Sequence, residues 1–200
     1  MDQNYTLLND FNVQVEERRI LIRLGYKPKS SQVNSSVGQY IEEFKKKLPQ
    51  LIRPKAVYTL LDYEETNKHP VFKGAQKIAL CLCTIGPELE KECSHYTEKN
   101  EILKAFVLDS FGSEAAEDIA RQSDRIIAQR AREMGLWPSK RFSPGYGIWN
   151  IKEQKYVFDV LPSDKVGVRL TDTFMMVPRK SVSYRINFFP DKESSTRSFK

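Results

Sequence analysis

The chain has 200 residues, of which 40% are hydrophobic and 29% charged, and its formal net charge is +6. This composition is that of a globular protein and excludes the disordered and fibrous classes. A chain of this length buries roughly 70% of its unfolded surface, so a full core needs no disulfide or metal staple.

The first half of the chain is predicted to begin with two helices. Apolar residues at three- and four-residue spacings indicate a short helix over 13–25, which Gly25 ends. A second helix is expected over 37–48, and Pro49 and Pro54 bracket its exit.

Two strands and a third helix follow. The segments Ala56–Tyr63 and Gln76–Thr84 are rich in apolar and β-forming residues between Pro, Gly and charged clusters, which predicts strands. Pro87 suits a first helical turn, and Glu88 and Glu90 suit the positive end of a helix dipole, so a helix is expected there.

The longest helical pattern runs over 100–134 and ends at Gly135. One helix of that length would extend about 50 Å at 1.5 Å per residue. Because Gly112 is a potential break or close-packing point, we expect two helices that meet near Phe111–Ser113.

The last third of the chain changes character. A short helix is expected over 151–161, strands over 173–189, and breaks at Gly167 and Pro178. We predict one domain over 1–200, with N-terminal helices and strands in 1–100, a ligand-binding portion in 101–190 and a frayed tail in 191–200.

The sequence also bounds the compartment and the partners. No apolar run approaches a membrane span and no secretory signal is visible, so a cytoplasmic protein without a membrane partner is expected. The basic residues are diffuse, and Lys45–Lys47 lacks interleaved aromatic residues, so we expect no nucleic-acid partner. If the protein did bind nucleic acid, its affinity for nucleic acid would fall steeply as the salt concentration rises.

Three cysteines leave two interpretations open. Cys81, Cys83 and Cys93 cannot all pair, and a Cys-x-Cys within a strand points both side chains to one face. Together with His95 they could bind zinc, but free, buried thiols are the favoured prediction. No metal site is expected.

The strongest local motif is Arg141-Phe142-Ser143-Pro144-Gly145-Tyr146-Gly147. Proline fixes one turn dihedral, glycine permits positive φ or close backbone approach, and Arg141 offers a planar donor fork to a carboxylate. Tyr146 can stack or hydrogen-bond. The motif can thus be a ligand cradle or an ordinary Pro-Gly loop, and the chain has no Walker, dinucleotide or zinc-hydrolase motif.

This motif resembles the Arg-x-x-Pro-Gly-Tyr run of the reactivation (activation) domain of cobalamin-dependent methionine synthase, which binds S-adenosylmethionine. A second run, from Leu170 to Ser183, resembles the Leu-Thr-acid-Ser-x-x-Met-x-Pro-x-x-Ser-Val-Ser run of that family. The helix segment Ala115-Ala116-Glu117 resembles its Leu-Ala-Glu. The resemblance implies an α+β fold with a twisted, mainly antiparallel sheet and long helices packed against it.

The resemblance also implies a binding site for S-adenosylmethionine. Arg141 would meet the methionine carboxylate, Tyr146 would close over the ligand, and Ser143 and Gly145 would contribute backbone contacts. Glu117 would accept from a cationic or hydroxyl group of the ligand. No residue is expected to be catalytic, because the sulfonium methyl group is already activated.

The implied function is that of a stand-alone accessory subunit for methionine biosynthesis. It would support reductive remethylation of cob(II)alamin in a cobalamin-dependent methionine synthase that lacks its own activation domain, with an electron from a flavodoxin-like donor and cobalamin supplied by that enzyme. The alternative is a partner of another corrinoid methyltransferase without S-adenosylmethionine binding. It is motivated by Lys192-Glu193-Ser194, which replaces the family's aromatic ligand contact.

Overall fold

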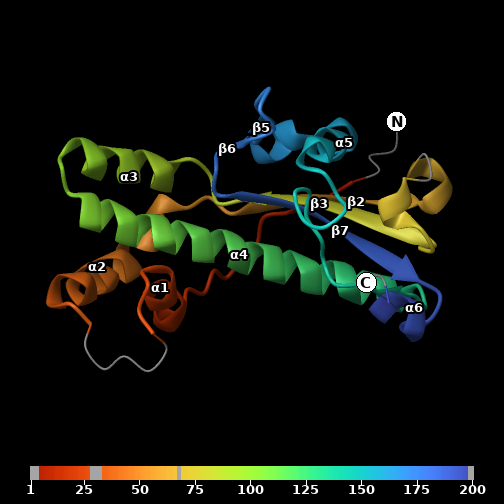
Figure 1. Ribbon diagram of the computed structural model, residues 1–200, viewed down its shortest axis with the longest axis horizontal. Coiled ribbons are helices and arrows are strands. Elements are labelled where there is room, and N and C mark those ends of the chain that lie inside the picture. The colour runs from red at the N-terminus through yellow and green to blue at the C-terminus, as the bar shows by residue number, and fades with distance from the viewer. Residues whose placement is uncertain (1–4, 28–32, 67–68, 198–200) are drawn as a thin grey trace.

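The computed structural model describes residues 5–27, 33–66 and 69–197. Its centre is a five-stranded sheet in the order β1-β2-β3-β7-β4, in which all neighbours are antiparallel (Figure 1). A separate pair, β5 and β6, is also antiparallel. The strands are β1 (Thr6–Leu8), β2 (Lys55–Asp62), β3 (Lys77–Thr84), β4 (Trp137–Pro138), β5 (Arg169–Leu170), β6 (Met176–Val177) and β7 (Ser181–Phe189).

Helices cover both faces of this sheet. The longest, α4, runs along the molecule and contacts β3 and β7, while α5 lies on the opposite face (Figure 1). The α+β architecture expected from the sequence is therefore confirmed. The helices are α1 (Glu17–Arg23), α2 (Ser35–Leu51), α3 (Glu88–Glu98), α4 (Ile102–Glu133), α5 (Gln154–Val160) and α6 (Lys192–Arg197), with 3₁₀ turns at Tyr63–Thr66, Pro70–Phe72, Ile151–Glu153 and Ser163–Val166.

The central strand β3 is buried on both faces. Alternate side chains, including Cys81 and Cys83, enter the core under α1–α4, and those between them, including Leu80 and Leu82, enter the core on the α5 side. This double burial explains why β3 reads as a continuous apolar run rather than an alternating one. Both strands predicted in the first half, β2 and β3, are confirmed.

The prediction of two helices between residues 100 and 134 is wrong. The helix α4 is continuous over 32 residues. Gly112 is buried where α3 and the segment before β7 press on α4, and a Cβ there would lie 2.6 Å from Cδ2 of Leu89 and 3.2 Å from Cε of Lys180. This glycine therefore allows close packing and does not break the helix.

The helix expected over 13–25 is shorter than predicted, because α1 begins only at Glu17. The residues before it are held against α4: the backbone N–H of Gln14 donates to Oδ2 of Asp118 at 2.9 Å, and Nε2 of Gln122 donates to the carbonyl oxygen of Asn12 at 2.9 Å. These tertiary contacts outweigh the local helical pattern.

Two other boundaries differ from the expectation. Helix α2 continues past Pro49, which lies in its last turn. Within the tail that was predicted to fray over 191–200, α6 forms, and Oδ1 of Asp191 caps its first turn by accepting from the backbone N–H of Ser194 at 2.8 Å; residues 198–200 lie outside the described part of the chain. No helix of the described residues is long and apolar enough to cross a membrane.

The packing at Gly112 gives a stability prediction. We expect Gly112→Val to lower the free energy of unfolding by about 1–3 kcal/mol, because the added atoms overpack the contact with Leu89. Gly38→Ala in α2 is the control, since a Cβ there meets nothing within 4 Å. It should raise stability by about 0.5–1 kcal/mol. Urea unfolding followed by circular dichroism measures both, and equal effects would show that Gly112 is not a close-packing position.

Candidate functional site

Two of the residues that the sequence singled out form an ion pair beside α4. Nη2 of Arg141 donates to Oε2 of Glu117 at 2.5 Å, across 24 positions of sequence. About a quarter of the Arg141 side chain and a third of the Glu117 side chain remain exposed. The pair is therefore partly desolvated but still reachable from solvent.

The surroundings of Arg141 hold its charge. Its Cζ lies 5.7 Å from the ring centroid of Tyr184, whose hydroxyl donates to the carbonyl oxygen of Ala120 at 3.3 Å. Burial alone would lower the pKa of Arg141, but the hydrogen bond and charge of Glu117 outweigh it, so this pKa lies above its ordinary value. Burial raises the pKa of nearby Asp124 against the opposing charges of Arg141 and Arg125.

The backbone around Arg141 is fixed by the edge of the sheet. The backbone N–H of Ser139 donates to the carbonyl oxygen of Asn187 at 2.8 Å, and Phe142 and Arg185 exchange two backbone hydrogen bonds of 2.8 and 3.0 Å. The chain thus follows β7 beyond β4. Arg141 is held between these anchors, on the side of α4.

The turn after Arg141 is closed by its own backbone. The N–H of Gly145 donates to the carbonyl oxygen of Trp149 at 2.7 Å. The N–H of Trp149 donates to the carbonyl oxygen of Tyr146 at 3.0 Å. Gly145 has a φ of 93°, in the left-handed region that glycine favours. Trp149 is buried in the core on the α5 side and anchors the turn from below.

The structure brings only some of the predicted site residues together. Arg141 and Glu117 are in contact, and Ser143 and Gly145 lie in the adjoining turn, where the carbonyl oxygen of Ser143 accepts from the N–H of Tyr146 at 3.4 Å. The N–H of Gly145 is used inside the turn. Tyr146 stands at the tip of the turn with 68% of its surface exposed. The roles assigned to these five residues remain predictions.

Sequence reasoning missed Arg185, which lies beneath this turn. It is 3% exposed, and among the described residues its Nε and Nη1 have no hydrogen-bond acceptor. Its Cζ lies 5.1 Å from the ring centroid of Phe142 and 5.9 Å from that of Trp149. Burial lowers the pKa of Arg185 to about 10. No local signal marked it, because β7 also contains Ser181, Ser183 and Asn187, so a polar residue in this strand is not exceptional.

The cysteines are not part of this site. All three are buried free thiols, as expected, and burial raises the pKa of Cys81 and of Cys93 to about 12. Thiols with such pKa values carry almost no thiolate at neutral pH. Within residues 5–27, 33–66 and 69–197, no three His, Cys, Asp or Glu side chains gather as metal ligands.

Comparison with known proteins gives one informative result. No protein-family model matches the sequence, and no curated protein matches it. Among solved structures, the chain is similar to the MetH reactivation domain bound to AdoHcy, with a TM-score of 0.64 and 16% sequence identity over 90% of this chain and 71% of that chain. The fold of this chain is therefore that of a methionine synthase reactivation domain, as its sequence motifs indicated.

The buried guanidinium gives a second stability prediction. An unpaired buried charge is costly, and the aromatic contacts recover only part of that cost. We expect Arg185→Met to raise the free energy of unfolding by about 1–3 kcal/mol. Arg185→Lys keeps the charge but loses the planar contact with Phe142 and should lower stability. If chemical denaturation shows Arg185→Met to be the less stable variant, the guanidinium must have an acceptor.

Proposed function

We propose that this protein binds S-adenosylmethionine beside α4 and supports reductive remethylation of cob(II)alamin in a partner enzyme. The partner would be a cobalamin-dependent methionine synthase without its own activation domain. Support comes from the shared fold of the MetH reactivation domain bound to AdoHcy and from the two sequence runs around Arg141 and Leu170–Ser183.

The observation that carries the proposal is the Arg141–Glu117 pair. The methionine end of S-adenosylmethionine is a zwitterion, with one carboxylate and one ammonium group. Its carboxylate matches the planar fork of Arg141, and its ammonium group matches the carboxylate of Glu117. The ligand can therefore replace one internal ion pair by two external ones, without leaving either side chain unpaired.

The turn would then hold the rest of the ligand. Tyr146 is free at the tip to cover it, and the carbonyl oxygen of Gly145 lies on the same turn. When bound, the ligand supplies an activated methyl group, which the cobalamin of the partner accepts once a flavodoxin-like donor has supplied one electron, and S-adenosylhomocysteine leaves. This chain contributes the orientation and proximity of the ligand and needs no acid, base or nucleophile of its own. The proposed compartment is the cytoplasm.

The binding prediction is tested by calorimetry with S-adenosylmethionine. Loss of a charged hydrogen-bond partner costs about 1.5–3 kcal/mol, so Arg141→Ala should bind about 10- to 100-fold more weakly than the unchanged protein. Glu117→Gln should weaken binding in the same direction, because the ammonium group loses its counter-charge.

Arg130→Ala is the matched control for these variants. Arg130 lies near the C-terminal end of α4, away from Glu117, and pairs with another glutamate, Glu133, at 3.0 Å. Its loss should leave the affinity unchanged. No heat at millimolar S-adenosylmethionine, or equal affinity in Arg141→Ala, would refute the binding site.

The accessory role has its own test. A cobalamin-dependent methionine synthase that lacks an activation domain is oxidised to its inactive state, and turnover is followed after this protein, S-adenosylmethionine and reduced flavodoxin are added. We expect turnover to return, and to return less with Arg141→Ala. If S-adenosylmethionine still binds but turnover does not return, the proposed partner enzyme is refuted and the proposed ligand is retained.

One observation favours the alternative function. Arg141 and Glu117 already satisfy each other, and residues 192–194 lie in helix α6 rather than presenting an aromatic ring. A protein that had lost its ligand could keep this arrangement and serve another corrinoid methyltransferase through contacts alone. Capture of a different purified corrinoid protein in a pull-down, with no S-adenosylmethionine binding, would favour this function.

A further inference from the structure

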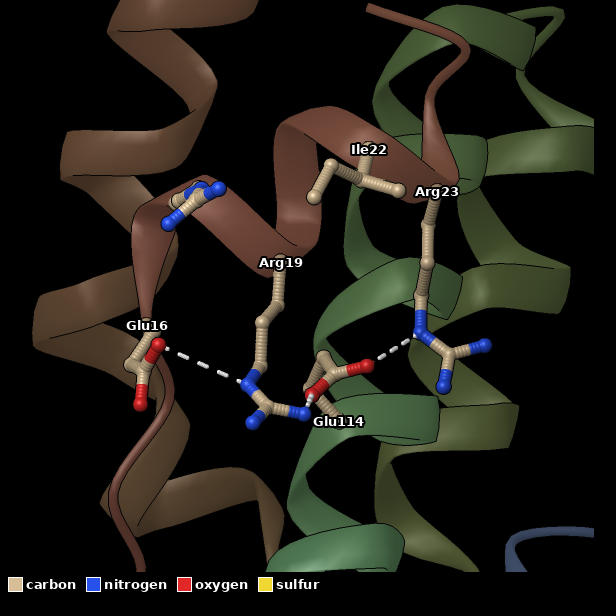
Figure 2. A pocket seen from close by; sticks show the side chains of 6 residues that line it. Glu16, Arg19, Ile22, Arg23 and Glu114 are labelled. Atoms are coloured by element: carbon tan, nitrogen blue, oxygen red, sulfur yellow. Dashed lines mark hydrogen bonds and ion pairs between the residues drawn. The ribbon is translucent and has the colours of Figure 1, made fainter. Parts of the chain in front are cut away.

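A cavity of about 370 Å³ opens between α1 and α4, one turn of α4 before Glu117 (Figure 2). Three arginines of α1 and one carboxylate of α4 converge on it. Neither Arg141 nor the turn that follows it belongs to its walls. The residues that line the cavity are Glu16, Arg18, Arg19, Ile22, Arg23 and Glu114.

Glu114 is the unusual group in this cavity. Only 6% of its side chain is exposed, and its Oε1 accepts from Nε of Arg23 at 2.5 Å. Its Oε2 is buried without a hydrogen-bond donor among the described residues, and Nη1 of Arg19 lies 3.9 Å away. Figure 2 shows this carboxylate between the guanidinium groups of Arg19 and Arg23. A buried carboxylate oxygen of this kind needs a donor.

The arginines around the cavity offer hydrogen-bond donors and positive charge. Arg23 uses only its Nε toward Glu114, Arg19 contacts Glu16 through Nε at 3.4 Å, and Arg18 has no ion pair within the described part of the chain. The remaining guanidinium N–H groups can bind a carboxylate with two parallel hydrogen bonds. With three arginines against two glutamates, the cavity keeps a net positive charge.

We propose that this cavity is a binding site for a small α-amino acid. The ligand carboxylate is held by the free guanidinium N–H groups, and its α-ammonium group donates to Oε2 of Glu114. A plain anion would leave Glu114 without its donor, and a plain amine would face three arginines. An α-amino acid carries both charged groups on one carbon and so satisfies the two walls together, with Ile22 as the apolar contact.

The ion pairs of Glu114 are not what holds α1 in place. Ile20 of α1 is fully buried in the core, and the chain before α1 is tied to α4 through Asp118 at 2.9 Å. Substitutions in the cavity should therefore leave the fold intact. Thermal unfolding of each variant checks this directly.

The test is an NMR titration of the full chain with three matched probes: L-alanine, propionate, which lacks the ammonium group, and ethylamine, which lacks the carboxylate. We expect L-alanine to shift the resonances of α1 and of Glu114, with a dissociation constant on the order of millimolar, and the other two probes to bind at least tenfold more weakly. Equal binding of propionate and L-alanine, or no shift at all, would overturn the proposal.

Glu114→Gln makes the test sharper. Removal of the negative charge should weaken L-alanine about tenfold while it strengthens propionate, whereas a carboxylate that does not touch the ligand would strengthen both. Arg141→Ala is the matched control, because the proposed S-adenosylmethionine site could also attract a zwitterion. If L-alanine binding persists in Glu114→Gln and disappears in Arg141→Ala, the amino acid binds at that other site and the cavity proposal fails.

Discussion

The structure depends on the buried face of one helix and the carboxylates that flank it. The apolar side of α4 lies against β3 and β7, and burial of this face is the main contribution that holds the helix in position. Glu114, Glu117 and Asp118 lie three and four residues apart, on one side of the helix. Each contacts a different segment: Glu114 contacts α1, Glu117 the chain after β4, and Asp118 the residues before α1.

This arrangement explains why ion pairs and candidate sites coincide. A carboxylate near the core has already lost much of its hydration, so a cationic partner must be supplied from a neighbouring segment. Arg141 and Arg23 supply it, at Glu117 and Glu114 respectively. Where the arginine remains partly exposed, as Arg141 does, the proposed zwitterionic ligand would take over both halves of the pair. Neither the arginine nor the carboxylate would lose its counter-charge in that exchange.

The sequence predicted the architecture better than the ends of the helices and the contacts between elements. The strand β3 and the runs around Arg141 and Leu170–Ser183 were visible, because apolar strand residues and special turn residues leave local patterns. The continuity of α4 was not visible, because Gly112 is explained only by the approach of Leu89. The late start of α1 and the buried position of Arg185 likewise depend on contacts distant in sequence, which no local pattern contains.

The turn after Arg141 has a buried anchor residue and an exposed tip. Trp149 holds it from below in the core, whereas Ile148, its neighbour in sequence, is 82% exposed, and Tyr146 is also mostly exposed. Large apolar side chains that are exposed close together can mark a contact surface for another protein, because contact with the partner would bury them. The exposed tip thus fits the proposed accessory role, in which the partner would supply the chemistry and this chain the positioning.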